Sequence, residues 1–386
     1  MTIAINAPPS SIHWKVLCSD SGSFFRRCHG MCVHNNKIIG VGCHATSSSI
    51  STSMFDIGKK SFKTLPNVPT KHPSVSCVSC NGYFYIFPNY NQKMDFHYRL
   101  NLSKLEEWEK IQRPGGMEDY EHRQFFSDGE TFFMFTFLHN ESMPESTSTG
   151  WNNSMIEIIF HRTIYAHAIV RNKIYFIGGL KHTHYISDSL SSVKVFDMST
   201  KTWSASAPDI PKGLYSAAAT TYRNRWIIVT GGGWQNLECF IFDVQTQNWT
   251  TSQTTLTDCR EDHHSTIIEE QLVLIGGIYV PFRDPLGRMP IETYNKPYIQ
   301  SIDVAYILPA WGIIGHFVLL RILLEKNRAH VLKPTNCDED FNDLIQKMML
   351  HLDYDSFCSV LSFLVPKKDS SEESLPNQNR WLLDLF

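Results

Sequence analysis

The residues best suited to chemistry in this chain are histidines that lie beside carboxylates. Glu121 precedes His122, and Glu261 and Asp262 precede His263. An imidazole titrates near neutral pH, and a neighbouring carboxylate can orient it, so these groups could transfer protons. The sequence has no Gly-x-Ser-x-Gly, no Walker phosphate loop and no His-Glu-x-x-His, which leaves the common nucleophile, nucleotide and zinc-peptidase signatures unmatched.

Cysteines form a second group that could bind a ligand. Cys77 and Cys80 have CxxC spacing, and two further cysteines and two histidines fall between residues 28 and 34. A zinc site needs such pairs on turns, where the ligands converge. Both groups fall instead on predicted strands, whose successive side chains face opposite ways. We therefore predict reduced thiols, no metal and no cofactor.

A short pattern that recurs along the chain must position these residues. An apolar run ends in a glycine pair at 172–179, 225–232 and 271–277. The first two runs are followed by a strand that ends in Phe-Asp, and a tryptophan stands six residues after each Asp, at Trp203 and Trp249. Short apolar runs bounded by glycine are typical of strands.

The pattern extends to six units. The aligned positions are Gly42, Phe87, Phe135, Gly178, Gly231 and Gly276, at intervals of 45, 48, 43, 53 and 45 residues. The second and third units lack the glycine pair, and the third also lacks the tryptophan. A fixed period of this length with several strands per unit predicts a propeller.

These residues resemble the kelch repeat, over residues 12–311. The resemblance implies one four-stranded blade per unit and hence an all-β fold, a six-bladed kelch-type β-propeller with a C-terminal α-helical appendage. Glycines at positive φ would let the second strand end in a sharp turn. Trp203 and Trp249 would be largely buried between blades. No BTB-like or F-box-like domain precedes the repeats.

The ring needs a strand to close it, and two segments compete. The segment around Trp14 has the pattern of a last strand with no strands before it. It could supply the fourth strand of the sixth blade, beside a strand near 299–304. The alternative is that 305–311, which ends in Trp311, supplies this strand. We favour the segment around Trp14.

The period changes after the propeller. Apolar residues at helical spacing predict helices within 312–365, and 366–386 reads as a polar, flexible tail with an apolar end. The uncharged run 304–320 is interrupted by proline and glycine, so we expect a buried strand-to-helix transition and no membrane span. The helices could pack on the propeller or contact a second protein.

Composition sets the broad class. Hydrophobic residues make up 42% of the chain, charged residues 19%, and the net charge is −3. The sequence has no stripe of basic residues, so we do not expect it to bind nucleic acid. The N-terminus has no basic segment followed by a long apolar core, so we expect no signal peptide and a cytoplasmic protein, with the nucleus not excluded.

The predicted working surface lies where the links between blades and the long loops between second and third strands emerge together. Loops carry function on such scaffolds, and Trp, Tyr and Arg dominate contact energies. The predicted partner-binding residues are Arg27, His72, His122, Trp151, His167, Tyr185, Tyr215, Trp234, His263, Tyr279, Phe282 and Arg283.

The resemblance and this surface predict a non-catalytic protein–protein interaction module, as a substrate-receptor or scaffolding subunit with no catalytic residues. The alternative is a sugar-modifying enzyme of the mutarotase or epimerase kind, because some kelch propellers are enzymes. It would use a histidine-lined channel mouth, where carboxylates flank His122 and His263.

Overall fold

The structure is a computed structural model of the whole chain. The chain divides into two compact units, Met1–Ala310 and Trp311–Phe386. The described residues all lie in the first unit and are 14–18, 28–43, 50–69, 75–88, 96–112, 123–137, 147–148, 155–160, 163–182, 187–233, 236–279, 294–295, 299–304 and 307–308. The predicted helices in 312–365 and the tail 366–386 lie outside these residues.

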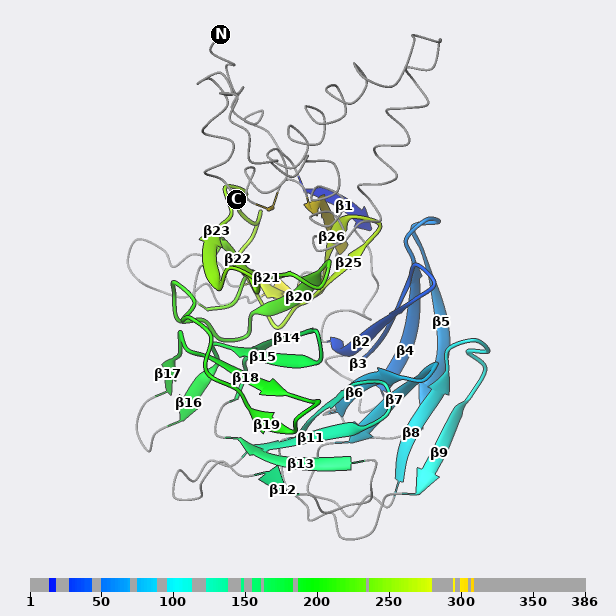
Figure 1. Ribbon diagram of the computed structural model, residues 1–386. Helices are drawn as coiled ribbons and strands as arrows, with labels where there is room; N and C mark the ends of the chain where they lie inside the picture. The colour runs from blue at the N-terminus through cyan, green and yellow to red at the C-terminus, as the bar shows by residue number, and fades with distance from the viewer. Residues whose placement is uncertain are drawn as a thin grey trace, which may run out of the picture. The chain divides into compact units, whose positions relative to one another are not determined.

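The described residues are all-β and form six four-stranded sheets, which we number as blades in chain order (Figure 1). Blade 1 has β2 (Cys28–His34), β3 (Lys37–Cys43), β4 (Ile50–Asp56) and β5 (Ser61–Val68). Blade 2 has β6 (Val75–Cys80), β7 (Tyr83–Pro88), β8 (Phe96–Asn101) and β9 (Trp108–Gln112). Blade 3 has β10 (Arg123–Ser127), β11 (Phe132–Phe137), β12 (Thr147–Ser148) and β13 (Met155–Phe160).

Blade 4 has β14 (Ala166–Val170), β15 (Lys173–Ile177), β18 (Val193–Asp197) and β19 (Thr202–Trp203). Blade 5 has β20 (Ala218–Tyr222), β21 (Trp226–Thr230), β22 (Cys239–Asp243) and β23 (Asn248–Thr251). Blade 6 has β25 (His264–Ile268), β26 (Gln271–Ile275), β29 (Ile299–Asp303) and β1 (Lys15–Cys18). Two small sheets, β16 (Leu180–His182) with β17 (Ser187–Ser189), and β24 (Arg260–Glu261) with β27 (Ile278–Tyr279) and β28 (Tyr294–Asn295), complete the strands.

The first strands of neighbouring blades contact one another, which makes the arrangement a propeller. β2 contacts β6, β6 contacts β10, β14 contacts β20, and β25 contacts both β20 and β2. Between blades 3 and 4, the Phe126 ring of β10 lies 4.9 Å from the His167 ring of β14. The prediction of an all-β propeller is therefore confirmed.

Blade 6 combines both ends of the propeller sequence. β1 pairs antiparallel with β29, with Lys15 opposite Ser301. The prediction that the segment around Trp14 supplies the fourth strand is confirmed. The turn before β26 bonds to both neighbouring blades, because Asn36 of blade 1 donates to Glu269 and Tyr222 of blade 5 donates to Glu270.

Blade 3 departs from the regular order of strands. After β11 the chain forms the outer strand β12 first and then returns as β13, which lies between β12 and β11 and runs parallel to β11. The predicted loop 136–154 thus contains an outer strand at Thr147–Ser148. The outer strand of blade 3, β12, precedes β13 in the chain, so no outer strand follows β13 in which a tryptophan could stand.

The apolar cores lie between blades. Blades 1 and 2 share a cluster that includes Ile39 and Phe84, and blades 4 and 5 share one that includes Tyr175 and Phe242. Blades 6 and 1 meet at Ile38, among others. Each blade therefore depends on its neighbours for the burial of its apolar faces.

The blade-packing tryptophans are less buried than predicted. Trp203 and Trp249 are half-buried, so the expectation that they are largely buried is wrong in degree. Trp203 lies 6.1 Å from the Phe135 ring of blade 3, measured between ring centroids. The Trp249 indole N–H donates to the Pro208 carbonyl after blade 4, at 2.8 Å. One edge of the indole must reach this exposed carbonyl, which leaves part of the ring in solvent.

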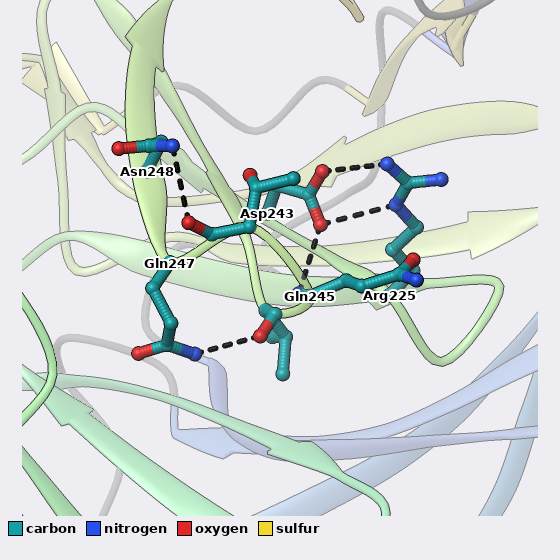
Figure 2. Close-up of polar contacts among 7 residues, drawn as sticks. Arg225, Asp243, Gln245, Gln247 and Asn248 are labelled. Atoms are coloured by element: carbon teal, nitrogen blue, oxygen red, sulfur yellow. Dashed lines mark hydrogen bonds and ion pairs between the residues drawn. The ribbon is translucent and has the colours of Figure 1, made fainter. Parts of the chain in front are cut away.

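The recurring Phe-Asp sequence ends the third strand and starts the turn to the fourth. In blade 5 the Asp243 carboxylate accepts the Gln245 N–H at 2.9 Å, an Asx turn. Arg225 approaches both oxygens of the same carboxylate, at 3.0 and 2.7 Å (Figure 2). This forked ion pair is largely shielded, with the two side chains 11% and 16% exposed. It joins the start of β21 to the end of β22.

We expect this ion pair to make the free energy of unfolding decrease at acidic pH. Burial alone would raise the pKa of Asp243, but hydrogen bonds from Arg225 and from the Gln245 N–H outweigh it and hold the pKa below its usual value. A lowered folded-state pKa contributes stability above the unfolded pKa and loses it as pH falls through the folded pKa. In the Asp243→Asn variant, the denaturation midpoint is therefore expected to fall less steeply as the pH is lowered. An unchanged acid limb would contradict this role of Asp243.

Candidate functional site

One end of the blades gathers the links between blades and the long connections. In blade 4 the first strand begins beside the end of the second, with Ala166 opposite Ile177, and blades 5 and 6 repeat this register. The links therefore emerge together with the second-to-third-strand connections. We call this end the loop face. Its described residues in blades 4 to 6 are the leading loops 163–165, 214–217 and 260–263 and the connection segments 178–182, 187–192, 231–233, 236–238, 276–279 and 294–295.

The glycine pairs join neighbouring blades at the loop face. Gly179 N–H donates to the Leu214 carbonyl at 2.7 Å, and Gly232 N–H donates to the Arg260 carbonyl at 2.9 Å. Both glycines have positive φ. A Cβ on the preceding Gly231 would lie 2.5 Å from the Arg260 carbonyl oxygen. Only glycine fits this approach, which explains why the repeat signature requires it.

The leading loops are bonded to one another in series. Ser216 N–H donates to the Ile164 carbonyl at 2.9 Å, and Asp262 N–H donates to the Ser216 carbonyl at 3.1 Å. The three residues each stand two positions before their strand and have φ of 53°, 53° and 52°. Positive φ is costly for a β-branched residue such as Ile164. The side chain of Ile164 is nevertheless 46% exposed. Backbone bonds thus fix the loops of three blades as one platform.

The long connections also contain regular structure. In blade 4, β16 and β17 form a hairpin within the connection. In blade 6, β24 of the leading loop pairs with β27 of the connection, with Arg260 opposite Tyr279 and Glu261 opposite Ile278. The connection of blade 6 is therefore tied to the leading loop through backbone hydrogen bonds.

A tyrosine and a glutamate meet across blades 5 and 6. The Tyr215 hydroxyl is hydrogen-bonded to the Glu261 carboxylate, and both side chains are half-buried. Burial and the neighbouring Asp262 raise the pKa of Glu261, against the hydrogen bond from Tyr215, which lowers it. Burial and the charge of Glu261 raise the pKa of Tyr215 to about 12. The pair therefore carries a proton on Tyr215 at neutral pH.

The carboxylate of Glu261 is only partly satisfied. Its Oε1 atom is shielded from solvent and has no hydrogen-bond partner among the described residues. A buried acceptor without a donor costs about 1–3 kcal/mol. The loop face therefore holds a carboxylate oxygen that would gain from an additional donor.

The side chains of Arg260 and His263 are buried beneath the loop face. Arg260 is 1% exposed and donates to the Gly276 carbonyl and to Gln300 Oε1, both at 3.1 Å. His263 is 5% exposed, and its Nε2 lies 2.9 Å from Thr230 Oγ1. Burial, Arg260 and His264 lower the pKa of His263. The structure thus places His263 under the loop face as a neutral packing residue.

His167 lies on the first strand of blade 4. Its ring packs edge-on against Phe126 of blade 3 at 4.9 Å and lies 6.2 Å from the Tyr165 ring, between centroids. Burial and the nearby His264 lower the pKa of His167 to about 4. At neutral pH this imidazole is uncharged and joins blades 3 and 4 by ring packing.

The predicted partner-binding residues are described only in part. The structure places Tyr215 on the loop face, His263 beneath it and His167 on a first strand, and it gives the backbone of Tyr279 beside Arg260. The remaining predicted residues lie outside the described part of the chain: Arg27, His72, His122, Trp151, Tyr185, Trp234, Phe282 and Arg283. The sequence analysis did not pair Glu261 with Tyr215, and it did not select Ile164. The three residues lie in the leading loops of blades 6, 5 and 4.

The described part of the chain contains neither a metal-binding cluster nor a membrane-spanning helix. Among these residues, no group of three or more His, Cys, Asp or Glu side chains could hold a metal ion. The same residues include no helix with the length and apolar character of a membrane span.

Comparisons with known proteins bear on the family. The kelch motif profile matches residues 162–208, which contain blade 4. A solved structure described as "Structure of YjhT" is 13% identical, with a TM-score of 0.46, and the alignment covers 67% of this chain and 96% of that one. No curated protein matches the sequence. The chain thus contains a kelch motif, and its four-stranded sheets form a β-propeller fold.

Proposed function

We propose that this protein is a non-catalytic protein-interaction module that binds a partner through the loop face. The observation that carries the proposal is the series of backbone hydrogen bonds from Ile164 through Ser216 to Asp262. It fixes the loops of three blades before any partner arrives. A preorganised surface loses little conformational entropy on binding, so more of the contact energy appears as affinity.

The side chains on this platform suit a protein contact. Ile164 offers exposed apolar surface, Tyr215 offers a half-buried ring, and Asp262 is exposed. The aromatic and arginine residues predicted for the longer connections, Trp234 and Arg283 among them, would extend the same surface. We further propose a role as a substrate-receptor or scaffolding subunit in the cytoplasm, or in the nucleus, with the second compact unit making another contact.

Of the two histidines that the enzyme alternative would use, His122 and His263, only His263 is described, and its position gives this alternative no support. His263 is buried, and its Nε2 already faces Thr230. A proton-transfer role would require this imidazole to reach a substrate.

The proposal is tested by comparing paired substitutions at opposite ends of the blades. Trp234→Ala with Arg283→Ala should leave the melting temperature close to wild type. It should weaken partner binding by more than about 1 kcal/mol for each true hot spot. The control is Lys59→Ala with Lys104→Ala, two exposed lysines in turns that follow third strands, at the other end of the blades. Equal binding by both double variants would contradict the proposal.

A further inference from the structure

His263 lies where blades 5 and 6 are joined. Its side chain is 5% exposed. A Cβ added to Gly231 of blade 5 would lie 2.7 Å from Cε1 of the imidazole, and a Cβ added to Gly277 of blade 6 would lie 2.7 Å from the Cβ of His263. The imidazole is thus enclosed by the glycine turns of both blades.

Two backbone hydrogen bonds hold the leading loop of blade 6, residues 260–263, against blade 5. Gly232 N–H donates to the Arg260 carbonyl at 2.9 Å, and Asp262 N–H donates to the Ser216 carbonyl at 3.1 Å. His263 directly follows Asp262 in the chain. Movement of the imidazole out of its site would therefore disturb the bonds that fix this loop.

The site of His263 has no acceptor for a second imidazole proton. Its Nε2 lies 2.9 Å from Thr230 Oγ1, while its Nδ1 is shielded from solvent and has no hydrogen-bond partner among the described residues. The blade 5 groups that face the ring, Thr230 and Gly231, carry no charge. A protonated imidazole has two N–H donors, so its Nδ1–H would be buried without an acceptor.

The charged groups around His263 also oppose a positive charge on it. Arg260, in the same loop, is 1% exposed and places a cation nearby, and His264 follows on β25. Burial, Arg260 and His264 all lower the pKa of His263. The carboxylates of Glu261 and Asp262 do not offset this, because neither is hydrogen-bonded to the imidazole. The closed loop therefore holds His263 neutral.

We propose that His263 is a pH-sensitive switch that holds the leading loop of blade 6 against blade 5 at neutral pH and releases it in acid. In the released loop the imidazole is hydrated and can take up a proton. Imidazole is the side chain whose charge changes closest to neutral pH, so a modest acidification is sufficient. The consequence, weaker partner binding in acid, rests on the proposed function.

The direction of the effect follows from linkage. The folded-state pKa of His263 is lowered, whereas an imidazole in the released loop titrates at about 6.5. The closed loop is fully favoured above this value, and it loses stability as the pH falls below it, because only the released loop binds the proton. The loss of stability from Asp243 belongs to lower pH, because an unperturbed aspartate titrates at about 3.9.

Hydrogen exchange of the intact chain tests the switch without any partner. The reporters are the Gly232 and Asp262 amides, whose hydrogen bonds join the two blades. After correction for the intrinsic effect of pH on exchange, their protection factors should fall by about tenfold between pH 7.5 and 5.5. The reference is the Leu102 amide of blade 2, which donates to the Gly82 carbonyl and should change less. Unchanged protection at Gly232 and Asp262, or an equal fall at Leu102, would overturn the proposal.

Matched variants assign the effect to His263. His263→Gln keeps a side chain that can bond to Thr230 but cannot take up a proton, so the protection of Gly232 and Asp262 should become nearly independent of pH. His34→Gln removes the histidine at the end of β2, next to the turn at the other end of the blades, and should keep the wild-type dependence. The same pH dependence in His263→Gln as in wild type would refute the switch.

Imidazole ¹⁵N chemical shifts of the wild type keep the test valid if His263→Gln does not fold. A His263 ring that is still neutral in the folded protein at pH 5.5 supports the switch. Titration of this ring near its usual pKa of about 6.5 in the folded protein would refute it.

The failures of the two proposals are distinguishable. If Trp234→Ala with Arg283→Ala weakens partner binding at pH 7.5 but the protection of Asp262 does not depend on pH, the interaction module stands and the pH switch falls. If protection depends on pH through His263 while the double variant binds every protein partner as wild type does, the pH switch stands and the proposed function falls.

Discussion

Trp14→Ala is expected to lower the free energy of unfolding of the propeller by about 3–5 kcal/mol, the range for buried aromatic residues cut back to alanine. The Trp14 side chain is 6% exposed, and its indole N–H donates to the Thr255 carbonyl after blade 5 at 2.9 Å. The residue directly precedes β1, the strand that completes blade 6. The substitution therefore removes apolar contact and an inter-blade hydrogen bond at the point where the ring closes. Chemical denaturation of the full chain, followed by tryptophan fluorescence, would measure the loss.

The matched control is Val16→Ala, two residues further along the same segment. Val16 is 53% exposed, so little apolar area is lost with its methyl groups. A change within about 0.5 kcal/mol is expected, as for surface substitutions. Similar losses in the two variants would show that the burial of Trp14 does not set the effect, and a negligible loss in Trp14→Ala would contradict closure by the N-terminal strand.

Gly231→Ala should destabilise the propeller strongly, because it combines backbone strain with a steric clash. Gly231 has φ +61°, and an added Cβ would lie 2.5 Å from the Arg260 carbonyl oxygen and 2.7 Å from the His263 ring. The left-handed conformation costs alanine about 1–2 kcal/mol. Overpacking against a backbone atom adds about 1–3 kcal/mol. The sum predicts a loss of about 2–5 kcal/mol in the free energy of unfolding, and a displaced leading loop of blade 6.

Gly82→Ala separates the conformational cost from the clash. Gly82 has φ +76°, and nothing lies within 4 Å of an added Cβ. Only the left-handed cost of about 1–2 kcal/mol remains. Partner binding should fall in Gly231→Ala and remain in Gly82→Ala, because only the first disturbs the loop face. Equal destabilisation in the two variants would show that the close approach of Gly231 to blade 6 does not matter.

The fold was largely predictable from the repeats. Glycine pairs and Phe-Asp sequences repeat because each blade needs the same two devices: a turn that admits the neighbouring backbone, as at Gly231, and an Asx turn, as at Asp243. The closing strand could be located because a last-strand tryptophan, Trp14, stands where no strand precedes it. These are local requirements, and sequence patterns record local requirements well.

Blade 3 shows where the patterns fail. The sequence lacks a fourth-strand tryptophan there, and the structure explains the gap by the reordering of β12 and β13. A strand of two residues, Thr147–Ser148, has no hydrophobic pattern to reveal it. Parallel pairing of β13 with β11 depends on contacts across the sheet, which the order of residues along the chain does not specify.

The candidate site was found only in part for a similar reason. Tyr215 was selected because it is aromatic and lies in a link between blades. Its partner Glu261 lies in the next blade, and their contact depends on the register that joins Ser216 to Asp262. The positive φ of Ile164, which accompanies its exposed position, could not be predicted from the residue type, because isoleucine rarely adopts this conformation.

Site-specific photo-crosslinking tests the central claim most directly. A benzophenone amino acid would replace Tyr215 on the loop face in one variant and Lys104, in an exposed turn at the other end of the blades, in another. After irradiation with candidate partners, cross-linked protein would be quantified and the attachment sites mapped by mass spectrometry. Binding through the loop face predicts a discrete protein adduct from position 215 and little or none from position 104. Adducts from position 104 alone, or equal adducts from both positions, would contradict it.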